Sequence, residues 1–388
     1  MTEEKEINQL PKDWKWVKLG EVCNKISLNK IKIKQKEYLE VGDYPVVDQG
    51  QDLIGGYFND KSLIVPEEPP YIIFGDHTKV KKFINFNFIA GADGVKVLKA
   101  KDVIDSKFLY FSLFKIKIED KGYARHFQLL EKELFPLPPK PTQLAIVSKI
   151  EELFSEIENG IKSLLTAKEQ LKKYRQSVLK WAFENNTFKD FILKDVTEKI
   201  QIGPFGSQLH EEDYIENGIP LINPTHIKNG LIVADNSFSI LKSKRDSLPN
   251  YILKAGDVIM GRRGEMGRCG LVTNKEAGWF CGTGSLYFRP NTKKVNPVFL
   301  YYYLRSEPVK KYLDENAGGT TMANLNLKIV NDIPISLPPI EEQNKIVRVI
   351  ESRLSVADKM EESITESLQQ AEALKQSILK EAFEGRLI

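Results

Sequence analysis

Apolar residues recur at intervals of three and four along two long stretches of the chain, and this spacing predicts two long helices. The first stretch runs from Thr142 to about Phe183, and the second runs from Glu341 to about Phe383. The spacing persists for about six heptads in both, which is typical of a coiled-coil seam. Each stretch follows a Leu-Pro-Pro sequence, and proline disfavours the helical conformation of the residue before it. We therefore predict helical arms over residues 137–187 and 337–388.

The two arms are copies of each other. A shift of 200 residues aligns residues 137–184 with residues 337–384, and 18 of the 48 positions are identical. This is an internal duplication and not a solenoid, whose period would be far shorter. The arms carry net charges of +2 and −3, as expected of helices that pair with each other. Such a chain with antiparallel arms suits a partner that is itself two-fold related, and duplex DNA is one.

The blocks before the arms, residues 1–136 and 188–336, also match each other more weakly. Short apolar runs bounded by Gly, Pro, Asn and Asp predict strands and turns, with helices nearby. Residues 70–75 resemble residues 256–261, and residues 108–111 resemble residues 299–302, which we predict to be helical. The predicted fold is α+β: two similar domains joined by two long antiparallel helices that form a coiled coil, with pseudo-two-fold internal duplication.

The blocks differ most in polar segments that follow matched strands. Arg and Lys suit guanine in the major groove, and Gln and Asn suit adenine. A shared scaffold with different loop chemistry is how one fold reads two sequences. An ordinary solvated surface is the alternative for any single loop residue. The candidate DNA-binding residues are Gln49, Gln51, Asp76, His77, Lys79, Lys81, Lys82, Arg125 and His126 in the first block, and Ser207, Gln208, Arg262, Arg263, Arg268, Thr321 and Asn324 in the second.

Composition adds bounds on the class of protein. The 388 residues are enough for two or three domains, and the net charge of +3 is too small to diagnose nucleic-acid binding. The sequence contains no run of 18 apolar residues, so we predict no membrane span. Its polar N-terminus is unlike a signal peptide. Cys23, Cys269 and Cys281 lack metal-ligand spacing, so we expect a reduced cytoplasmic protein that binds no metal.

Taken together, these features resemble the specificity subunit of a type I restriction–modification system. The resemblance covers the order of block and Leu-Pro-Pro-led arm, repeated, and the C-terminal sequence of residues 383–388. Shorter stretches also resemble target-recognition domains of that family: residues 44–50, 74–78, 91–96, 203–207, 261–264 and 325–327.

The resemblance implies two target-recognition domains, 1–136 and 188–336, each reading one half of a split, asymmetric DNA site. The arms would set the spacer and dock two modification subunits, and restriction subunits would join that host-defence complex. We expect this chain to bind no cofactor, with S-adenosylmethionine, ATP and Mg held by the partner subunits. The residues expected at the docking and spacer surface are Leu137, Pro138, Gln143, Ile146, Ile150, Leu337, Pro338, Gln343, Ile346 and Ile350.

Two other classes of function compete with this interpretation. One is a stand-alone DNA methyltransferase or nuclease. Its nearest motif is Glu68-Pro69-Pro70-Tyr71, but a glutamate is too long for the first position, and no glycine fingerprint for a cofactor precedes it. We expect no catalytic residues. The other class is a coiled-coil scaffold without a DNA role, which steeply salt-dependent DNA binding would exclude.

Overall fold

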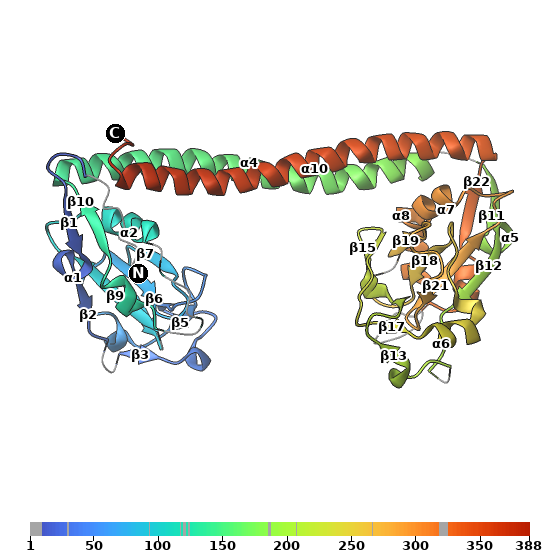
Figure 1. The fold of residues 1–388 in the computed structure, drawn as a ribbon, viewed down its shortest axis with the longest axis horizontal. Coiled ribbons are helices and arrows are strands. Elements are labelled where there is room, and N and C mark those ends of the chain that lie inside the picture. Colours follow the sequence, from blue (N-terminus) through green and yellow to red (C-terminus); the bar gives the residue numbers. More distant parts are fainter. Residues whose placement is uncertain are drawn as a thin grey trace, which may run out of the picture. The chain divides into compact units, whose positions relative to one another are not determined.

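Two compact units make up the chain. The computed structural model describes residues 10–28, 31–92, 94–116, 118, 122, 125–184, 188–206, 208–265, 267–317 and 325–388. The first unit comprises Met1–Leu164 and Glu366–Ile388, and the second comprises Leu165–Thr365. Two long helices, α4 (Lys140–Glu184) and α10 (Ile340–Phe383), contribute to both units (Figure 1). Each unit therefore combines one globular block with a segment of each helix.

The first unit contains two four-stranded sheets and a two-stranded ribbon. The antiparallel sheet has the order β2 (Cys23–Ile26), β9 (Val95–Ala100), β6 (Tyr71–Gly75), β7 (Lys81–Ile84). The mixed sheet has the order β3 (Lys32–Ile33), β8 (Ile89–Gly91), β4 (Tyr44–Val47), β5 (Gly56–Phe58). The ribbon pairs β1 (Lys15–Lys18) with β10 (Leu134–Leu137), which leads into α4. The remaining helices are α1 (Leu19–Val22), α2 (Ser106–Lys115) and α3 (Phe127–Leu130), with 3-10 turns at Gln35–Glu37 and Lys61–Leu63.

The second unit repeats the antiparallel sheet and the ribbon before the long helix, whereas its mixed sheet has a different strand order. Its antiparallel sheet has the order β12 (Thr197–Ile202), β21 (Ser285–Pro290), β18 (Val258–Gly261), β19 (Cys269–Leu271). Its mixed sheet has the order β13 (Tyr214–Ile215), β17 (Ser239–Ile240), β14 (Ile219–Ile222), β20 (Phe280–Cys281). Ribbons pair β11 (Lys189–Ile192) with β22 (Pro334–Leu337), and β15 (Ile227–Lys228) with β16 (Leu231–Ile232). The helices are α5 (Leu193–Val196), α6 (Lys242–Ser247), α7 (Pro297–Leu304), α8 (Glu307–Asn316) and α9 (Leu327–Asn331), with 3-10 turns at Glu211–Asp213, Pro224–His226 and Pro249–Tyr251.

The predicted α+β class and the internal duplication are confirmed by these elements. Residues 70–75 and 256–261 include β6 and β18, which occupy the same position in the two antiparallel sheets. Residues 108–111 and 299–302 lie on α2 and α7, as predicted.

Helices α4 and α10 run antiparallel within each unit (Figure 1), and each buries apolar residues in the core of the adjoining domain. In the first unit Phe383 of α10 packs edge-on against Phe108, with ring centroids 5.3 Å apart. In the second unit Phe183 of α4 packs in the same way against Phe299 at 5.4 Å. The predicted helical arms therefore also cover the two cores. None of the helices in the described part of the chain is both long and apolar enough to cross a membrane.

Two buried glutamines attach the helices to their domains by matching hydrogen bonds. In the first unit Gln143 Oε1 accepts from the Asp105 amide at 2.7 Å, and its Nε2 donates to the Pro138 carbonyl at 2.9 Å. In the second unit Gln343 Oε1 accepts from the Asn296 amide at 2.8 Å, and its Nε2 donates to the Pro338 carbonyl at 2.8 Å. Asp105 and Asn296 are the N-caps of α2 and α7. Each glutamine thus joins a long helix to the start of a domain helix.

This burial corrects the predicted docking surface. All ten residues proposed for docking are buried within this chain: Leu137, Pro138, Gln143, Ile146, Ile150, Leu337, Pro338, Gln343, Ile346 and Ile350. Their side chains pack in the cores or form the glutamine hydrogen bonds, so they hold the helices to the domains and cannot present a face to another subunit. The ten residues form five pairs that are identical in the two arms, and these identities reflect the shared internal packing.

Candidate nucleic-acid interface

Several loops of the first unit meet at one end of its antiparallel sheet. We call the turn after β6 (residues 75–80), the loop after β4 (residues 48–52), Gly94 and residues 125–126 the first polar cluster. Backbone hydrogen bonds hold it together: the Asp76 amide donates to the Gly94 carbonyl at 2.7 Å, and the His126 amide donates to the Asp76 carbonyl at 2.9 Å. Three segments distant in sequence are thereby fixed around Asp76.

The second unit builds the same frame with other residues. We call the turn after β18 (residues 261–268), residues 223–226, Gly284 and Leu325 the second polar cluster. The Arg262 amide donates to the Gly284 carbonyl at 2.9 Å, and the Leu325 amide donates to the Arg262 carbonyl at 3.1 Å. The strand registers agree, since Gly75 pairs with Val95 as Gly261 pairs with Ser285. Asp76 and Arg262 are therefore equivalent positions with opposite charge.

Asp76 is buried and ionised within the first cluster. Its Oδ1 accepts from the Phe127 amide at 2.8 Å, and its Oδ2 lies 3.2 Å from Lys96 Nζ. Burial alone would raise the pKa of this carboxyl, but the Phe127 amide and the Lys96 ammonium group outweigh it and lower the pKa below its usual range. The Asp76 carboxylate therefore binds groups inside the protein and not solvent.

Two further candidates of the first block are also buried. Lys82 Nζ donates to the Asp48 carbonyl at 2.9 Å and lies 3.7 Å from the Asp48 carboxylate. His126 Nδ1 lies 2.9 Å from the Asp76 carbonyl, while its Nε2 has no hydrogen-bond partner among the described residues. The expectation that Asp76, Lys82 and His126 contact bases directly is corrected here, because each side chain is enclosed by the domain. Their hydrogen bonds indicate instead that these three side chains position the loops around them.

The other candidates of the first block lie at the surface. Gln51 and Arg125 are exposed, and Gln49, His77, Lys79 and Lys81 are partly exposed. Gln49 Oε1 accepts from the His77 amide at 3.2 Å, which links two of the loops. The Lys81 ammonium group lies 4.8 Å from the centre of the Phe114 ring. Burial, and then the charge of Lys79, lower the pKa of Lys81 to about 8.

The second cluster presents arginines. Arg262 is partly exposed and its Nε donates to the Leu325 carbonyl at 3.1 Å, whereas Arg263 is exposed. Arg268 forms an ion pair with Glu265 at 2.9 Å. Gln208 is exposed, and its Oε1 accepts from the Tyr251 hydroxyl at 2.7 Å. The candidates Ser207, Thr321 and Asn324 lie outside the described residues.

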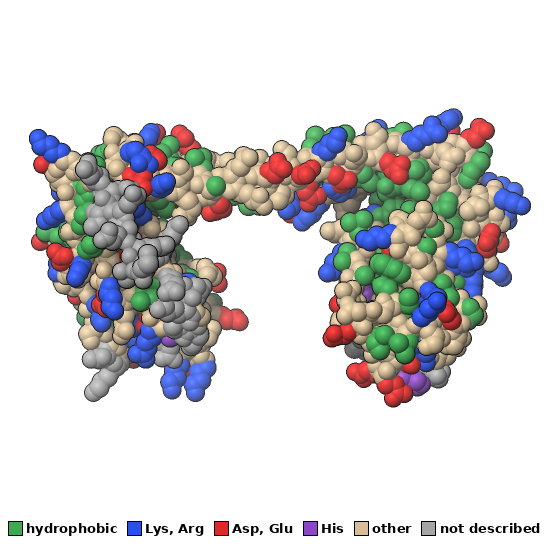
Figure 2. Space-filling model, viewed as in Figure 1, with side chains coloured by type: hydrophobic (Ala, Val, Ile, Leu, Met, Phe, Trp, Pro, Cys, Tyr) green, Lys and Arg blue, Asp and Glu red, His purple; other side chains and the backbone are tan. Residues whose placement is uncertain are grey.

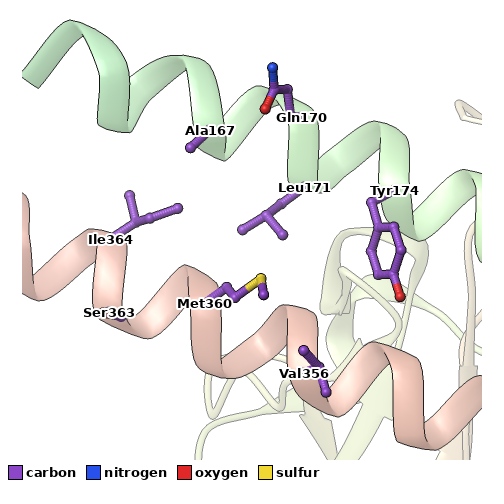
Figure 3. A pocket seen from close by; sticks show the side chains of 8 residues that line it. All are labelled: Ala167, Gln170, Leu171, Tyr174, Val356, Met360, Ser363 and Ile364. Carbon is purple, nitrogen blue, oxygen red and sulfur yellow. The ribbon is translucent and has the colours of Figure 1, made fainter.

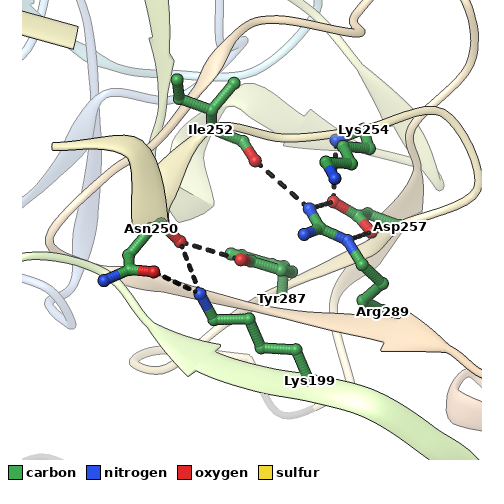
Figure 4. A network of polar contacts seen from close by, with 7 residues as sticks. All are labelled: Lys199, Asn250, Ile252, Lys254, Asp257, Tyr287 and Arg289. Carbon is green, nitrogen blue, oxygen red and sulfur yellow. Dashed lines mark hydrogen bonds and ion pairs between the residues drawn. The ribbon is translucent and has the colours of Figure 1, made fainter. Parts of the chain in front are cut away.

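An ion pair between the buried Asp257, which precedes β18, and the partly buried Arg289 of β21 was not predicted from the sequence. Asp257 and Arg289 form two hydrogen bonds of 2.8 and 2.6 Å, and Arg289 also donates to the Ile252 carbonyl at 3.2 Å (Figure 4). Beside them Lys199 donates to Asn250 Oδ1 at 2.8 Å. In the first unit the equivalent strand positions hold Tyr71 and Lys99, whose ammonium group lies 5.3 Å from the ring centre. Nothing local to Asp257 or Arg289 reveals the pairing, because 32 residues separate them.

The geometry gives no support to the catalytic motif considered at residues 68–71. Pro69 and Pro70 are joined by a cis peptide bond, and Tyr71 is buried at the start of β6. The Tyr71 ring packs edge-on against Phe88 at 5.3 Å. Across the described residues, no group of three or more His, Cys, Asp or Glu side chains is arranged to hold a metal ion.

On the face that Figure 2 shows, basic and acidic side chains are interspersed over each unit, so net charge does not outline the interface.

A family model described as the type I restriction modification DNA specificity domain matches residues 11–167 and 185–370. The chain belongs to this specificity family. The two matched segments are the two halves of the duplication. The prediction of a type I restriction–modification specificity subunit is thereby confirmed, and the stand-alone enzyme and the scaffold without a DNA role are not favoured.

The chain is similar in sequence to specificity subunits from a bacterium and an archaeon. The type I restriction enzyme EcoBI specificity subunit of Escherichia coli is 26% identical over 283 residues, which cover 66% of this chain and 59% of that subunit. The MjaVIII specificity subunit of Methanocaldococcus jannaschii is 24% identical over 409 residues, which cover 98% and 94%.

Solved structures share the fold of the whole chain. A chain from a structure on complex assembly and conformational transition of the type I R-M system superposes with a TM-score of 0.73 at 20% identity, covering 98% of this chain and 100% of that chain. The HsdS subunit from Thermoanaerobacter tengcongensis superposes with a TM-score of 0.56 at 20% identity, covering 98% and 99%. At such low identity the superpositions establish the architecture of this specificity-family chain and no individual contact.

Proposed function

We propose that each polar cluster reads one half of a bipartite, asymmetric DNA site. The observation that carries this proposal is the common frame around Asp76 and Arg262. The same backbone hydrogen bonds hold side chains of opposite charge and different shape. Recognition of two unlike half-sites needs a common frame with different loops, since the frame sets the position of the loops while their exposed side chains select the bases.

We propose further that this chain supplies recognition and assembly, while partner subunits carry the chemistry. Two modification subunits would methylate adenine with S-adenosylmethionine, and restriction subunits would use ATP and Mg. Incubation of the isolated chain with DNA and S-adenosylmethionine should therefore give no methyl transfer. Robust transfer by the chain alone would contradict this division of labour.

The proposal is tested in the host cell by single-molecule methylome sequencing with and without this chain. We expect one bipartite adenine-methylated motif to disappear when the chain is deleted and to return with the intact gene. Persistence of every methylated motif after deletion would refute the assignment.

An apolar groove along the helices provides the docking surface that the predicted residues cannot. In the second unit Ala167, Leu171 and Tyr174 of α4 face Val356, Met360 and Ile364 of α10 around a space of about 580 Å³ (Figure 3). Tyr174, Val356 and Met360 are 39%, 49% and 52% exposed. Exposed apolar side chains that gather in one groove are typical of a protein interface, and we assign this one to a modification subunit.

A charge placed in this groove should disrupt assembly. We expect Met360→Glu to weaken copurification of the modification subunits at least about tenfold, because a carboxylate would be buried without a partner. Lys359→Glu introduces a carboxylate at a neighbouring exposed position that does not line the groove, and it should assemble normally. Normal subunit stoichiometry with Met360→Glu, at unchanged helix content by circular dichroism, would remove the groove from the docking surface.

Lengthening the paired helices tests whether they set the spacer. One heptad inserted between Leu164 and Leu165, with another between Thr365 and Glu366, adds ~10.5 Å to each helix at ~1.5 Å per residue. At about 3.4 Å per base pair the axial limit is about three extra pairs. Each added base pair also rotates the second half-site about the DNA axis, since the duplex has about 10 pairs per turn. We therefore expect the spacer to lengthen by only about one or two base pairs. If methylome sequencing shows an unchanged spacer length, or altered half-site sequences, the helices do not set the distance between the half-sites.

A further inference from the structure

One large apolar side chain stands exposed beside the second polar cluster. Phe205 is 64% exposed, on the loop that follows β12. Two residues before it, the Gly203 amide donates to the Ser285 carbonyl at 2.9 Å, and a Cβ atom on Gly203 would collide with the Gly282 carbonyl. The turn at 282–285 also accepts the Arg262 amide through Gly284. Phe205 and the arginines therefore project from segments that meet at one turn.

The loop holds Phe205 in place from both sides. Pro204 is buried, and the Phe205 carbonyl accepts from the amides of Gln208 at 2.8 Å and Leu209 at 3.3 Å. Leu209 is buried in the core of the mixed sheet, and Gln208 is held by the Tyr251 hydroxyl. Because these hydrogen bonds already fix the backbone at Phe205, little backbone entropy is lost when its ring binds.

The first domain has no such group in the corresponding place. After β2 the chain reads Ser27-Leu28-Asn29-Lys30, and Leu28 is buried in the core. Packing of the fold therefore does not require the exposed ring, because the duplicate domain is built without one. The ring is a feature of the second domain alone.

We propose that Phe205 contacts the 5-methyl group of a thymine in the second half-site, in the major groove that the neighbouring arginines enter. This inference rests on the proposed function. A phenyl ring is one of the side chains that make apolar contact with this methyl group, which distinguishes thymine from the other bases in that groove. The specificity of the second domain then combines arginine hydrogen bonds with one apolar contact.

Deoxyuridine substitution tests the contact without changing the protein. The full chain, with its modification subunits, is titrated by fluorescence anisotropy against duplexes that carry the site found by methylome sequencing. Each thymine of the second half-site is replaced in turn by deoxyuridine, which removes only the methyl group. We expect one substitution to raise the Kd about fourfold, the effect of one buried methyl group. The Phe205→Ala complex should bind the thymine duplex at least about fivefold more weakly and should not distinguish it from that deoxyuridine duplex.

Thymines of the first half-site are the matched control, and their replacement should have the same effect on Phe205→Ala as on the unaltered complex. The inference is overturned if the second half-site contains no thymine, or if no deoxyuridine there raises the Kd. Weaker binding by Phe205→Ala with no deoxyuridine effect would also overturn it and would indicate a ring wedged between bases. Loss of a bipartite motif from the methylome upon deletion establishes the proposed function separately, so failure of the thymine contact leaves that function standing.

Discussion

The two polar clusters have the same backbone frame and different side chains. Around Asp76 the frame encloses a carboxylate that accepts from the Phe127 amide and pairs with Lys96. Around Arg262 it holds a guanidinium group that donates to Leu325, with Arg263 exposed beside it. The Asp76 carboxylate holds loops in place, whereas the equivalent Arg262 and its neighbour Arg263 place charge at the surface.

This difference shows which parts of a duplicated domain are free to change. The hydrogen bonds of the frame join backbone groups, so they do not depend on the side chains at positions 76 and 262. The buried glutamines Gln143 and Gln343 are identical because each binds the same set of backbone groups at its helix junction. Side chains that point out of the frame carry no such requirement, and we propose that recognition diverges there.

Exchange of a whole block should have the largest effect on this comparison. Residues 1–136 and 188–336 contribute to separate apolar cores, so each block carries its own packing. When residues 188–336 are replaced by the second block of a relative, we expect the second half-site to change completely and the first to stay the same. Methylome sequencing gives both halves at once. A change in both halves would show that the two clusters do not act independently.

Removal of an exposed arginine should affect one half-site by an intermediate amount. We expect Arg263→Ala to cost roughly 1–3 kcal/mol of binding free energy and to relax one position of the second half-site. Arg245→Ala is the matched control, since Arg245 lies in the same domain and pairs with its neighbour Asp246. Equal weakening on all sequences, with a shallower salt dependence, would show that Arg263 contacts phosphate.

The smallest expected effect concerns Lys81 and pH. Burial, and then Lys79, lower the pKa of Lys81 to about 8, so its proton is lost as the pH rises from 7 to 9. If Lys81 contacts DNA through its charge, affinity should fall over this range, by on the order of two- to fivefold, because one phosphate contact is weakened. Bound phosphate raises the pKa and keeps the fall small. Anisotropy titrations should show no such fall for Lys81→Arg, and an equal fall in that variant would place the titrating group elsewhere.

The helices and the duplication followed from the sequence alone. The predicted helices, 142–183 and 341–383, agree closely with α4 and α10, because a 3.6-residue period is a local property that any window of the chain displays. The matched strands β6 and β18 were found for a similar reason, as each is a continuous apolar run bounded by turn residues. The family assignment depended on the order of these local features and on their repetition.

Only the tertiary structure decided which polar residues face outward. Asp76 and His126 are 50 residues apart, and the pairing that buries both exists only once the sheet and the loop have come together. The sequence shows a polar residue at each place but not the partner that removes it from solvent. Lys82 and the two glutamines of the helix junctions are further examples, with carbonyl partners up to 49 residues away. Buried polar groups take their partners from contacts distant in sequence. The free energy lost when a polar group leaves water is recovered only where a hydrogen bond within the protein replaces the bond to water.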